Sequence, residues 1–262
     1  MTYSFTPGRR TGHSAVRPSP VFLLIVLITV AGGALAWDAD LDSVRAKVGV
    51  FVLVVAGWVV SLCLHEFAHA YVAWRAGDHE VEMRGYLTLN PLKYSHPVLS
   101  IGLPLVFIAL GGIGLPGGAV YLDTSRFSAG VQRLVSAVGP ASNGLCAVVL
   151  LVVIRMFGSV QEHGAFWLGL SFLAFLQITA FLLNILPVPG LDGYGIIEPS
   201  LSYETRRGLD QIKPYGMLIL FAVIFFTPLS RVFFDGVYAL FGLSGVPDVW
   251  AAYGSQLTRF WR

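Results

Sequence analysis

The sequence has little charge and almost no cysteine. Lys, Arg, Asp and Glu make up 12% of the 262 residues, whereas about 25% is typical of a soluble domain, so the composition excludes an ordinary soluble protein. The net charge of +2 is small and the Lys and Arg residues are scattered along the chain, which argues against nucleic-acid binding. The two cysteines, Cys63 and Cys146, both lie in apolar runs, so no disulfide framework is predicted.

What the sequence does contain is long apolar runs. Hydrophobic residues make up 55% of the chain and the mean hydropathy is +0.71, and a membrane span needs about 20 mostly apolar residues. Runs that reach or approach this length cover residues 21–37, 48–74, 98–120, 134–157, 166–187 and 215–229. The first run is longer than a signal-peptide core and lacks a clear cleavage site, so we predict that it is retained. The chain is therefore predicted to be an all-α polytopic membrane protein with about five to six membrane segments in a lipid bilayer.

Three segments predict departures from simple helical spans. Residues 110–120, "LGGIGLPGGAV", are rich in Gly and Pro, so we expect residues 98–120 to re-enter the membrane rather than cross it. Residues 82–90, "EMRGYLTLN", alternate loosely and predict a short strand or hairpin. Residues 231–243, "RVFFDGVYALFGL", are too short for a comfortable span and predict an interfacial helix.

The basic residues predict the orientation. Lys and Arg favour cytoplasmic loops, and most of the 17 in this chain fall on one side if the N-terminus is cytoplasmic and residues 98–120 re-enter. A full span there would invert the rest of the chain and move several of them outside. We expect residues 1–20 to form a disordered cytoplasmic tail, because they are polar and terminal.

The stretch "SLCLHEFAHA", residues 61–70, places three ionisable groups inside the second apolar run. On a helix, His65 and His69 project from one face, with Glu66 beside them. This is the spacing of HExxH zinc peptidases, whose glutamate is the general base, and composition alone would produce it on the order of 0.003 times in such a chain. The alternative is an interhelical hydrogen-bond network or a helix end in the headgroup region, but ionisable residues inside a span are costly and usually functional.

A catalytic zinc site needs a third protein ligand and an open position for water. Asp192 in "NILPVPGLDG", residues 184–193, is expected at the same cytoplasmic membrane face as the two histidines. We therefore predict that it completes the site for one Zn2+ ion per chain. The alternative for Asp192 is a helix cap or a turn residue before Gly193. The remaining histidines are predicted in the tail, in the following loop or on the opposite face: His13, His79, His96 and His163.

Together these motifs resemble the site-2 protease family of intramembrane zinc metalloproteases. The resemblance is carried by "HEFAH" in one span and "NILPVPGLDG" in a later one. Between them, "GYLTLNPLKYSHPVLSIGLP" and "GPASN" resemble the compact bacterial branch of the family. The resemblance covers residues 48–195, and we expect neither the PDZ domain nor the CBS pair that some relatives carry.

The resemblance implies roles for individual residues. His65, His69 and Asp192 would hold zinc and Glu66 would activate water, while Asn184 would hydrogen-bond the substrate carbonyl as an amide donor. For Asn184 the alternative is an amide that joins two helices, and for Asn143 of "GPASN" we favour packing.

The resemblance also implies a partner, a location and a domain plan. The implied substrates are single-pass transmembrane proteins, cleaved in a bacterial plasma membrane by an active site toward the cytoplasm. Independently of the resemblance, the local strand character of residues 85–90 and their position between the metal-binding span and the predicted re-entrant segment lead us to expect that a strand there holds the unwound substrate by edge pairing. Residues 21–230 would form one membrane protease domain with its catalytic core at residues 48–195, and residues 231–262 an amphipathic C-terminal segment. The oligomeric state is not indicated.

Two other classes of function are open on the residues alone. A non-proteolytic membrane protein could use the same ligands for structural zinc or metal sensing, but a structural site is usually closed by a fourth protein ligand and has no use for Glu66 as a base. A transporter could use intramembrane His, Glu and Asp side chains as an ion path, but no inverted repeat is visible. Substitution of Glu66 separates these classes, because a protease would lose turnover and keep its metal.

Overall fold

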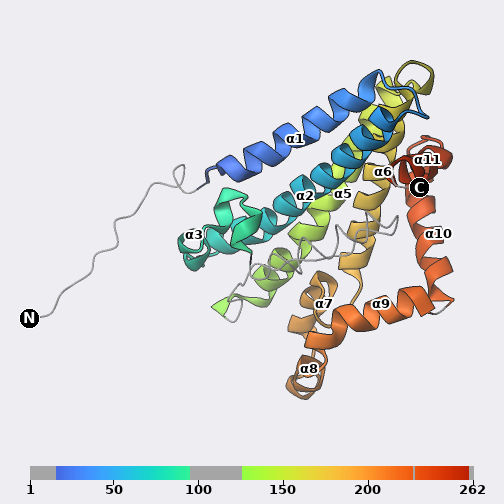
Figure 1. Cartoon of the computed structure of the whole chain (residues 1–262). Coiled ribbons are helices and arrows are strands. Elements are labelled where there is room, and N and C mark those ends of the chain that lie inside the picture. The colour runs from blue at the N-terminus through green and yellow to red at the C-terminus, as the bar shows by residue number, and fades with distance from the viewer. Residues whose placement is uncertain (1–15, 95–125, 227, 260–262) are drawn as a thin grey trace, which may run out of the picture.

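The structure is a computed structural model that describes residues 16–94, 126–226 and 228–259 (Figure 1). These residues are all-helical, and the chain is an integral membrane protein. An 87° bend separates Leu218–Ile224 from Leu229–Gly242, and this pair would make a fifth candidate span if it were counted as one. Within the described residues, four helices are long and apolar enough to cross a membrane: α1 (Pro20–Trp37), α2 (Val44–Arg75), α5 (Ala129–Phe157) and α6 (Val160–Ile185).

Three of the four long helices, α1, α2 and α5, begin at serine caps that the hydropathy pattern does not reveal. Ser43 Oγ accepts a hydrogen bond from the Ala46 backbone N–H at 3.1 Å, so α2 starts earlier than the predicted run and reaches 32 residues. Ser128 caps α5 in the same way. A capping oxygen satisfies a backbone donor that the first helical turn leaves unpaired. At 1.5 Å per residue α2 is about 48 Å long, so it extends beyond a hydrocarbon layer of about 30 Å.

Close helix contacts hold α1 against α2. A Cβ atom added at Gly32 would lie 2.5 Å from the Leu53 backbone nitrogen, and one added at Gly49 would lie 2.7 Å from that of Ala36. Small residues allow such backbone approach, which is the main source of packing between membrane helices. The α2 and α6 spans are the most buried of the four and form the centre of the bundle, whereas smaller shares of α1 and α5 are buried. The candidate site lies next to this centre, where α2 and α5 pack against each other.

After α6 the chain turns back under the bundle. The short helix α7 (Asp192–Ile197) follows a non-helical connection at residues 186–191, and it packs against α5. Figure 1 shows α7 and α8 (Tyr203–Asp210) near the lower ends of α5 and α6, while α10 returns beside α6 toward α11 (Asp248–Leu257). The chain therefore places Asp192 on a separate element beyond the end of α6.

The sixth predicted span, residues 215–229, is not one continuous helix. The helix α9 (Gly216–Phe226) has 11 residues, and α10 (Leu229–Gly242) begins after Pro228. Pro228 is the N-cap residue of α10, and proline has no backbone N–H to donate within a continuous helix, which explains a break here. The helix predicted at residues 231–243 is part of α10, whose Val237 and Phe241 are fully buried in the main hydrophobic core. Its interfacial position stays a prediction.

The strand predicted at residues 82–90 is wrong, and the described residues contain no strand. The segment forms the one-turn helix α3 (Glu80–Met83) and the 3-10 turns η1 (Tyr86–Thr88) and η2 (Pro91–Lys93). Gly85 and Leu89 both have positive φ, 77° and 55°, which breaks an extended backbone. Edge pairing of substrate at this segment therefore has no structural basis.

The side chains of this segment explain the error. Tyr86 and Leu87 are consecutive and both buried, whereas neighbours on a strand point to opposite faces. The loose alternation thus reflects a turn packed against α2. The re-entrant segment predicted at residues 98–120 and most of the predicted tail lie outside the described residues.

Candidate metal centre

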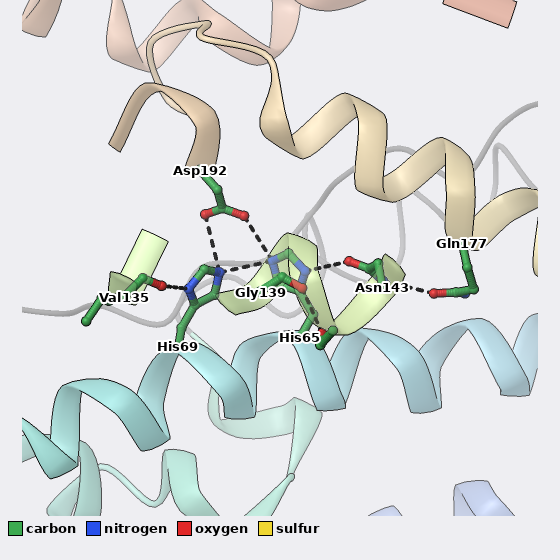
Figure 2. Close-up of polar contacts among 8 residues, drawn as sticks. His65, His69, Val135, Gly139, Asn143, Gln177 and Asp192 are labelled. Atoms are coloured by element: carbon green, nitrogen blue, oxygen red, sulfur yellow. Dashed lines mark hydrogen bonds and ion pairs between the residues drawn. The ribbon is translucent and has the colours of Figure 1, made fainter. Parts of the chain in front are cut away.

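The HExxH histidines meet on one face of α2. His65 and His69 are 6% and 5% exposed, and their Nε2 atoms lie 3.1 Å apart (Figure 2). The spacing of four residues brings two side chains to the same helix face, as the sequence predicts. Two imidazole nitrogens therefore point at one place inside the bundle.

Asp192 on α7 brings a third candidate ligand group to the two histidines. Its Oδ2 lies 3.1 Å from His65 Nε2 and its Oδ1 lies 3.3 Å from His69 Nε2, as the dashed lines in Figure 2 show. Asp192 is not a helix cap, because Leu191 is the N-cap residue of α7 and Asp192 is its first helical residue. Burial disfavours the charged carboxylate, but in the ion-free site a protonated His69 and the hydrogen bonds to both histidines lower the pKa of Asp192. A carboxyl group binds a metal in its deprotonated form, and a bound cation would take the place of that proton beside Asp192.

The other ring nitrogen of each histidine has a carbonyl partner. His69 Nδ1–H donates to the Val135 backbone oxygen at 2.5 Å, and His65 Nδ1–H donates to Asn143 Oδ1 at 2.6 Å. Because a carbonyl oxygen only accepts, these bonds keep the hydrogen on Nδ1 and leave the Nε2 lone pair for a metal. Asn143, which the sequence pattern assigned to packing, instead contacts a predicted zinc ligand directly.

A glycine leaves the space that an ion needs. A Cβ atom added at Gly139 would lie 2.1 Å from His69 Nε2 and 2.7 Å from His65 Nε2. Any larger residue on α5 would therefore fill the place toward which both ligand nitrogens point. The three ligand atoms lie within 4.8 Å of one another, and neighbouring ligand atoms of tetrahedral zinc are about 3.4 Å apart when its bonds are 2.0–2.1 Å long. Two imidazoles and one carboxylate are a donor set that fits a catalytic zinc ion.

The backbone of α7 is held in place by two further glycines. A Cβ atom at Gly193 would lie 2.2 Å from the Ile185 carbonyl oxygen, and one at Gly195 would lie 2.3 Å from Ser136 Oγ. The start of α7 therefore packs tightly against the end of α6 and against α5. This packing, rather than a long helix through residue 192, determines where Asp192 lies.

The other predicted residues lie as follows. Glu66 is 2% exposed on α2, next to His65, and Asn184 is 7% exposed in the last turn of α6. Among the other candidate histidines, His163 Nδ1 lies 3.0 Å from Asp38 Oδ1, outside the cluster. His79 is the N-cap residue of α3 and also lies outside it. His13 and His96 belong to the residues that the structure does not describe.

Sequence reasoning missed the residues that support the ligands. Val135 and Asn143 on α5 and Gln177 on α6 carry no metal-binding chemistry of their own, and none belongs to a recognised ligand pattern. The spacing offers one usable signal: Gly139 and Asn143 are four residues apart, so they share one face of α5.

Two histidines of an HExxH helix and an aspartate from a distant segment, held inside a bundle of membrane-length helices, define a membrane-embedded zinc peptidase. The chain is 57% identical over 251 residues to "Putative zinc metalloprotease Rip2" of Mycolicibacterium smegmatis, an alignment that covers 95% of this chain and 96% of that protein. It is 53% identical over 251 residues to the protein of the same name in Mycobacterium tuberculosis strain H37Rv, with the same coverage. "Putative zinc metalloprotease YwhC" of Bacillus subtilis is 39% identical over 183 residues, which are 66% of this chain and 79% of that protein.

These similarities place the chain in a family. No protein-family model matches it, and no solved structure matches it, so the assignment rests on the curated relatives and on the motifs. The chain belongs to the site-2 protease family of intramembrane zinc metalloproteases. It is a zinc metalloprotease, its cofactor is zinc and its substrates are proteins.

Proposed function

We propose that this protease hydrolyses peptide bonds within or near the transmembrane segment of single-pass membrane proteins, and that His65, His69 and Asp192 are its zinc ligands. The observation that carries the proposal is the convergence of these three side chains in the bundle, with ligand atoms within 4.8 Å of one another. A site buried among membrane-length helices is closest to substrates that are themselves in the membrane.

The proposed chemistry divides between the cofactor and the chain. Zinc in such a site supplies Lewis acidity, which makes water acidic enough to be activated near neutral pH. Glu66 accepts a proton from the attacking water and returns it to the nitrogen of the departing amine. Asn184 donates a hydrogen bond to the carbonyl oxygen of the scissile bond, where negative charge develops. Support for Glu66 is its place in HExxH and its burial, and support for Asn184 is its buried position eight residues before Asp192.

A membrane helix is not directly cleavable. Each of its backbone carbonyls already accepts a hydrogen bond within the helix, so we propose that the substrate unwinds locally before it reaches the site. We also propose that the N-terminus and the site face the cytoplasm, in a bacterial plasma membrane. The distribution of Lys and Arg supports this orientation.

The proposed domain plan follows from the same residues. All proposed ligands and catalytic groups fall in a catalytic core at residues 48–195, within a membrane domain of residues 21–230. A cytoplasmic tail, residues 1–20, precedes it, and an amphipathic segment, residues 231–262, follows it.

The proposal is tested with Glu66→Gln, which removes the base and keeps the size of the side chain. Membrane proteomes of cells that express this variant, the wild type or the control Glu80→Gln are compared. Glu80 is an exposed residue of α3 that pairs with Arg84, so its variant should behave as wild type. We expect one or a few single-pass proteins to accumulate, full-length or partly trimmed, only with Glu66→Gln.

The purified proteins complete the test. Loss of a general base lowers turnover about 10²- to 10⁴-fold, so Glu66→Gln should bind zinc as the wild type does but leave the accumulated substrate uncut. Cleavage of that substrate by Glu66→Gln at the wild-type rate would contradict the proposed role of Glu66. If variants with His65, His69 or Asp192 substituted still bound zinc as the wild type does, the proposed ligand set would be contradicted.

A further inference from the structure

A chain of buried polar side chains leads away from the proposed zinc site into the centre of the bundle. From Asn143 on α5, Nδ2–H donates to Gln177 Oε1 at 2.9 Å, and Figure 2 shows Gln177 reaching Asn143 from α6. Gln177 Nε2–H in turn donates to Ser61 Oγ at 2.8 Å. Ser61 lies one turn before His65 on α2, and its hydroxyl donates to the Trp58 carbonyl at 2.8 Å. The chain thus joins α2, α5 and α6 behind the ligand.

Every polar member of this chain is buried. Gln177 is fully buried, Asn143 is 4% exposed and Ser61 is 6% exposed. In such a site a donor or acceptor that loses its partner is not rescued by bulk water. If one amide group turns over, the neighbouring groups must therefore reorient as well to keep their hydrogen bonds.

The hydrogen bonds all run in one direction. The Trp58 carbonyl at the far end can only accept, so it favours the Ser61 hydroxyl as its donor and leaves Ser61 Oγ as an acceptor. Gln177 then turns its amide nitrogen to Ser61 and its oxygen to Asn143. In the same way, Asn143 turns its oxygen to His65 and holds the hydrogen on Nδ1.

Reversal of this chain would disable His65 as a ligand. If Asn143 turned its nitrogen toward the ring, His65 Nδ1 would have to accept, and the hydrogen would move to Nε2. Nε2 would then have no lone pair for a metal. His69 has no such vulnerability, because its partner is the Val135 backbone carbonyl, which cannot turn over.

We propose that Gln177 and Ser61 are positioning residues, which act through Asn143 to keep His65 in the tautomer that binds zinc. The inference rests on the proposed role of His65 as a zinc ligand. Neither residue touches the ligand atoms, so each acts at a distance on the metal and neither is a catalytic residue.

The test uses zinc affinity of the purified full-length protein, measured by competition with a chelator, rather than activity. Gln177→Met removes the acceptor and donor at nearly constant size, and Ser61→Ala removes the hydroxyl. Loss of the group hydrogen-bonded directly to a metal ligand lowers metal affinity roughly 10- to 100-fold, and we expect losses up to this range because each variant lets Asn143 turn its nitrogen toward His65. Gln177→Glu should restore most of the affinity, because a carboxyl oxygen still accepts from Asn143.

Thr179→Val is the matched control. Thr179 is also fully buried on α6, and its hydroxyl donates to the Phe175 carbonyl at 2.9 Å, outside the chain. The variant loses a buried hydroxyl near Gln177 and should bind zinc as the wild type does. Equal losses of affinity in Thr179→Val and Gln177→Met would mean a general packing effect and would overturn the inference.

Two further measurements separate positioning from simple support of the fold. In the zinc-free protein with 15N-labelled histidine, the His65 signal, identified by its loss in His65→Ala, should change from the Nδ1–H pattern to the Nε2–H pattern in Gln177→Met. In a double-mutant cycle, Gln177→Met should add little to the loss caused by Asn143→Leu, because both act through one hydrogen bond. An unchanged tautomer or additive losses would refute the proposal.

The outcome also separates this inference from the proposed function. His65→Ala alone should lose zinc. If it binds zinc as tightly as the wild type, the ligand assignment fails and the inference fails with it. If His65→Ala loses zinc whereas folded Gln177→Met and Ser61→Ala do not, only the positioning role is refuted. Ser61→Ala keeps the test decisive if Gln177→Met does not fold, since it removes only one oxygen.

Discussion

Substitution of Gly139 by alanine should remove zinc while leaving the protein folded. The added Cβ would lie 2.1 Å from His69 Nε2, 2.5 Å from His69 Cε1 and 2.7 Å from His65 Nε2. Non-bonded heavy atoms prefer separations of about 3.5–4.0 Å, so His69 would have to retreat by more than about 1 Å. Zinc–ligand distances tolerate only about 0.2 Å, and the ring is also held by its bond to Val135.

The size of the effect follows from these distances. Displacement of one of the three proposed ligands should weaken zinc binding at least about 100-fold, which corresponds to about 2.8 kcal/mol. Overpacking of a core typically costs about 1–3 kcal/mol of folding free energy. The free energy of unfolding of a typical domain is larger, about 5–15 kcal/mol. Zinc affinity should therefore fall by much more than the folded fraction does.

The assay compares zinc affinity with thermal unfolding in the wild type, Gly139→Ala and Gly144→Ala. Gly144 lies further along α5, and a Cβ atom there would meet Phe181 at 3.4 Å, an ordinary contact. Gly144→Ala should therefore keep both zinc and stability. A folded Gly139→Ala protein that binds zinc as tightly as the wild type would refute the reasoning, since it would mean that the space beside Gly139 is not where the ion lies.

Two other predictions concern the elements around the site. Gly193→Ala should displace α7 and lower zinc affinity, because the added Cβ would lie 2.2 Å from the Ile185 carbonyl oxygen. The control is Gly208→Ala on α8, where nothing lies within 4 Å of an added Cβ. Equal zinc affinities of the two variants in chelator competition would contradict the placement of α7. His163→Ala should destabilise the bundle by about 1 kcal/mol through loss of its stacking on Trp37, whose ring centroid lies 3.8 Å away. Thermal unfolding measures this loss, and zinc affinity should not change; loss of zinc would show that the two ends of the bundle are coupled.

Local patterns were sufficient to predict the four long helices of the bundle. Four of the apolar runs correspond to membrane-length helices, because burial of apolar side chains and internal backbone pairing dictate helices in lipid. Their ends were predicted less well. Capping by Ser43 starts α2 earlier than the predicted residue 48, and a proline ends α9 inside the predicted residues 215–229. These boundaries depend on one or two polar residues rather than on average hydropathy.

The segment at residues 82–90 shows where local pattern misleads. Its strand-favouring residues are Tyr86, Leu87 and Thr88, but the left-handed backbone at Gly85 and Leu89 turns the chain and buries Tyr86 and Leu87 together. Packing against α2 decides this conformation. Propensity for strands is weak, and tertiary contacts override it readily.

The sequence by itself determined the chemistry of the metal centre. A helix alone brings His65 and His69 to one face and places Glu66 beside them, since the spacing of four residues matches its turn. Only the tertiary structure decided what faces them. Asp192 reaches the histidines because α7 packs against the end of α6, and Gly139 leaves room because α5 crosses α2 at that point. Asn143 and Gln177 acquire their roles in the same way, because contacts between distant segments depend on how helices pack and leave no periodic trace along the chain.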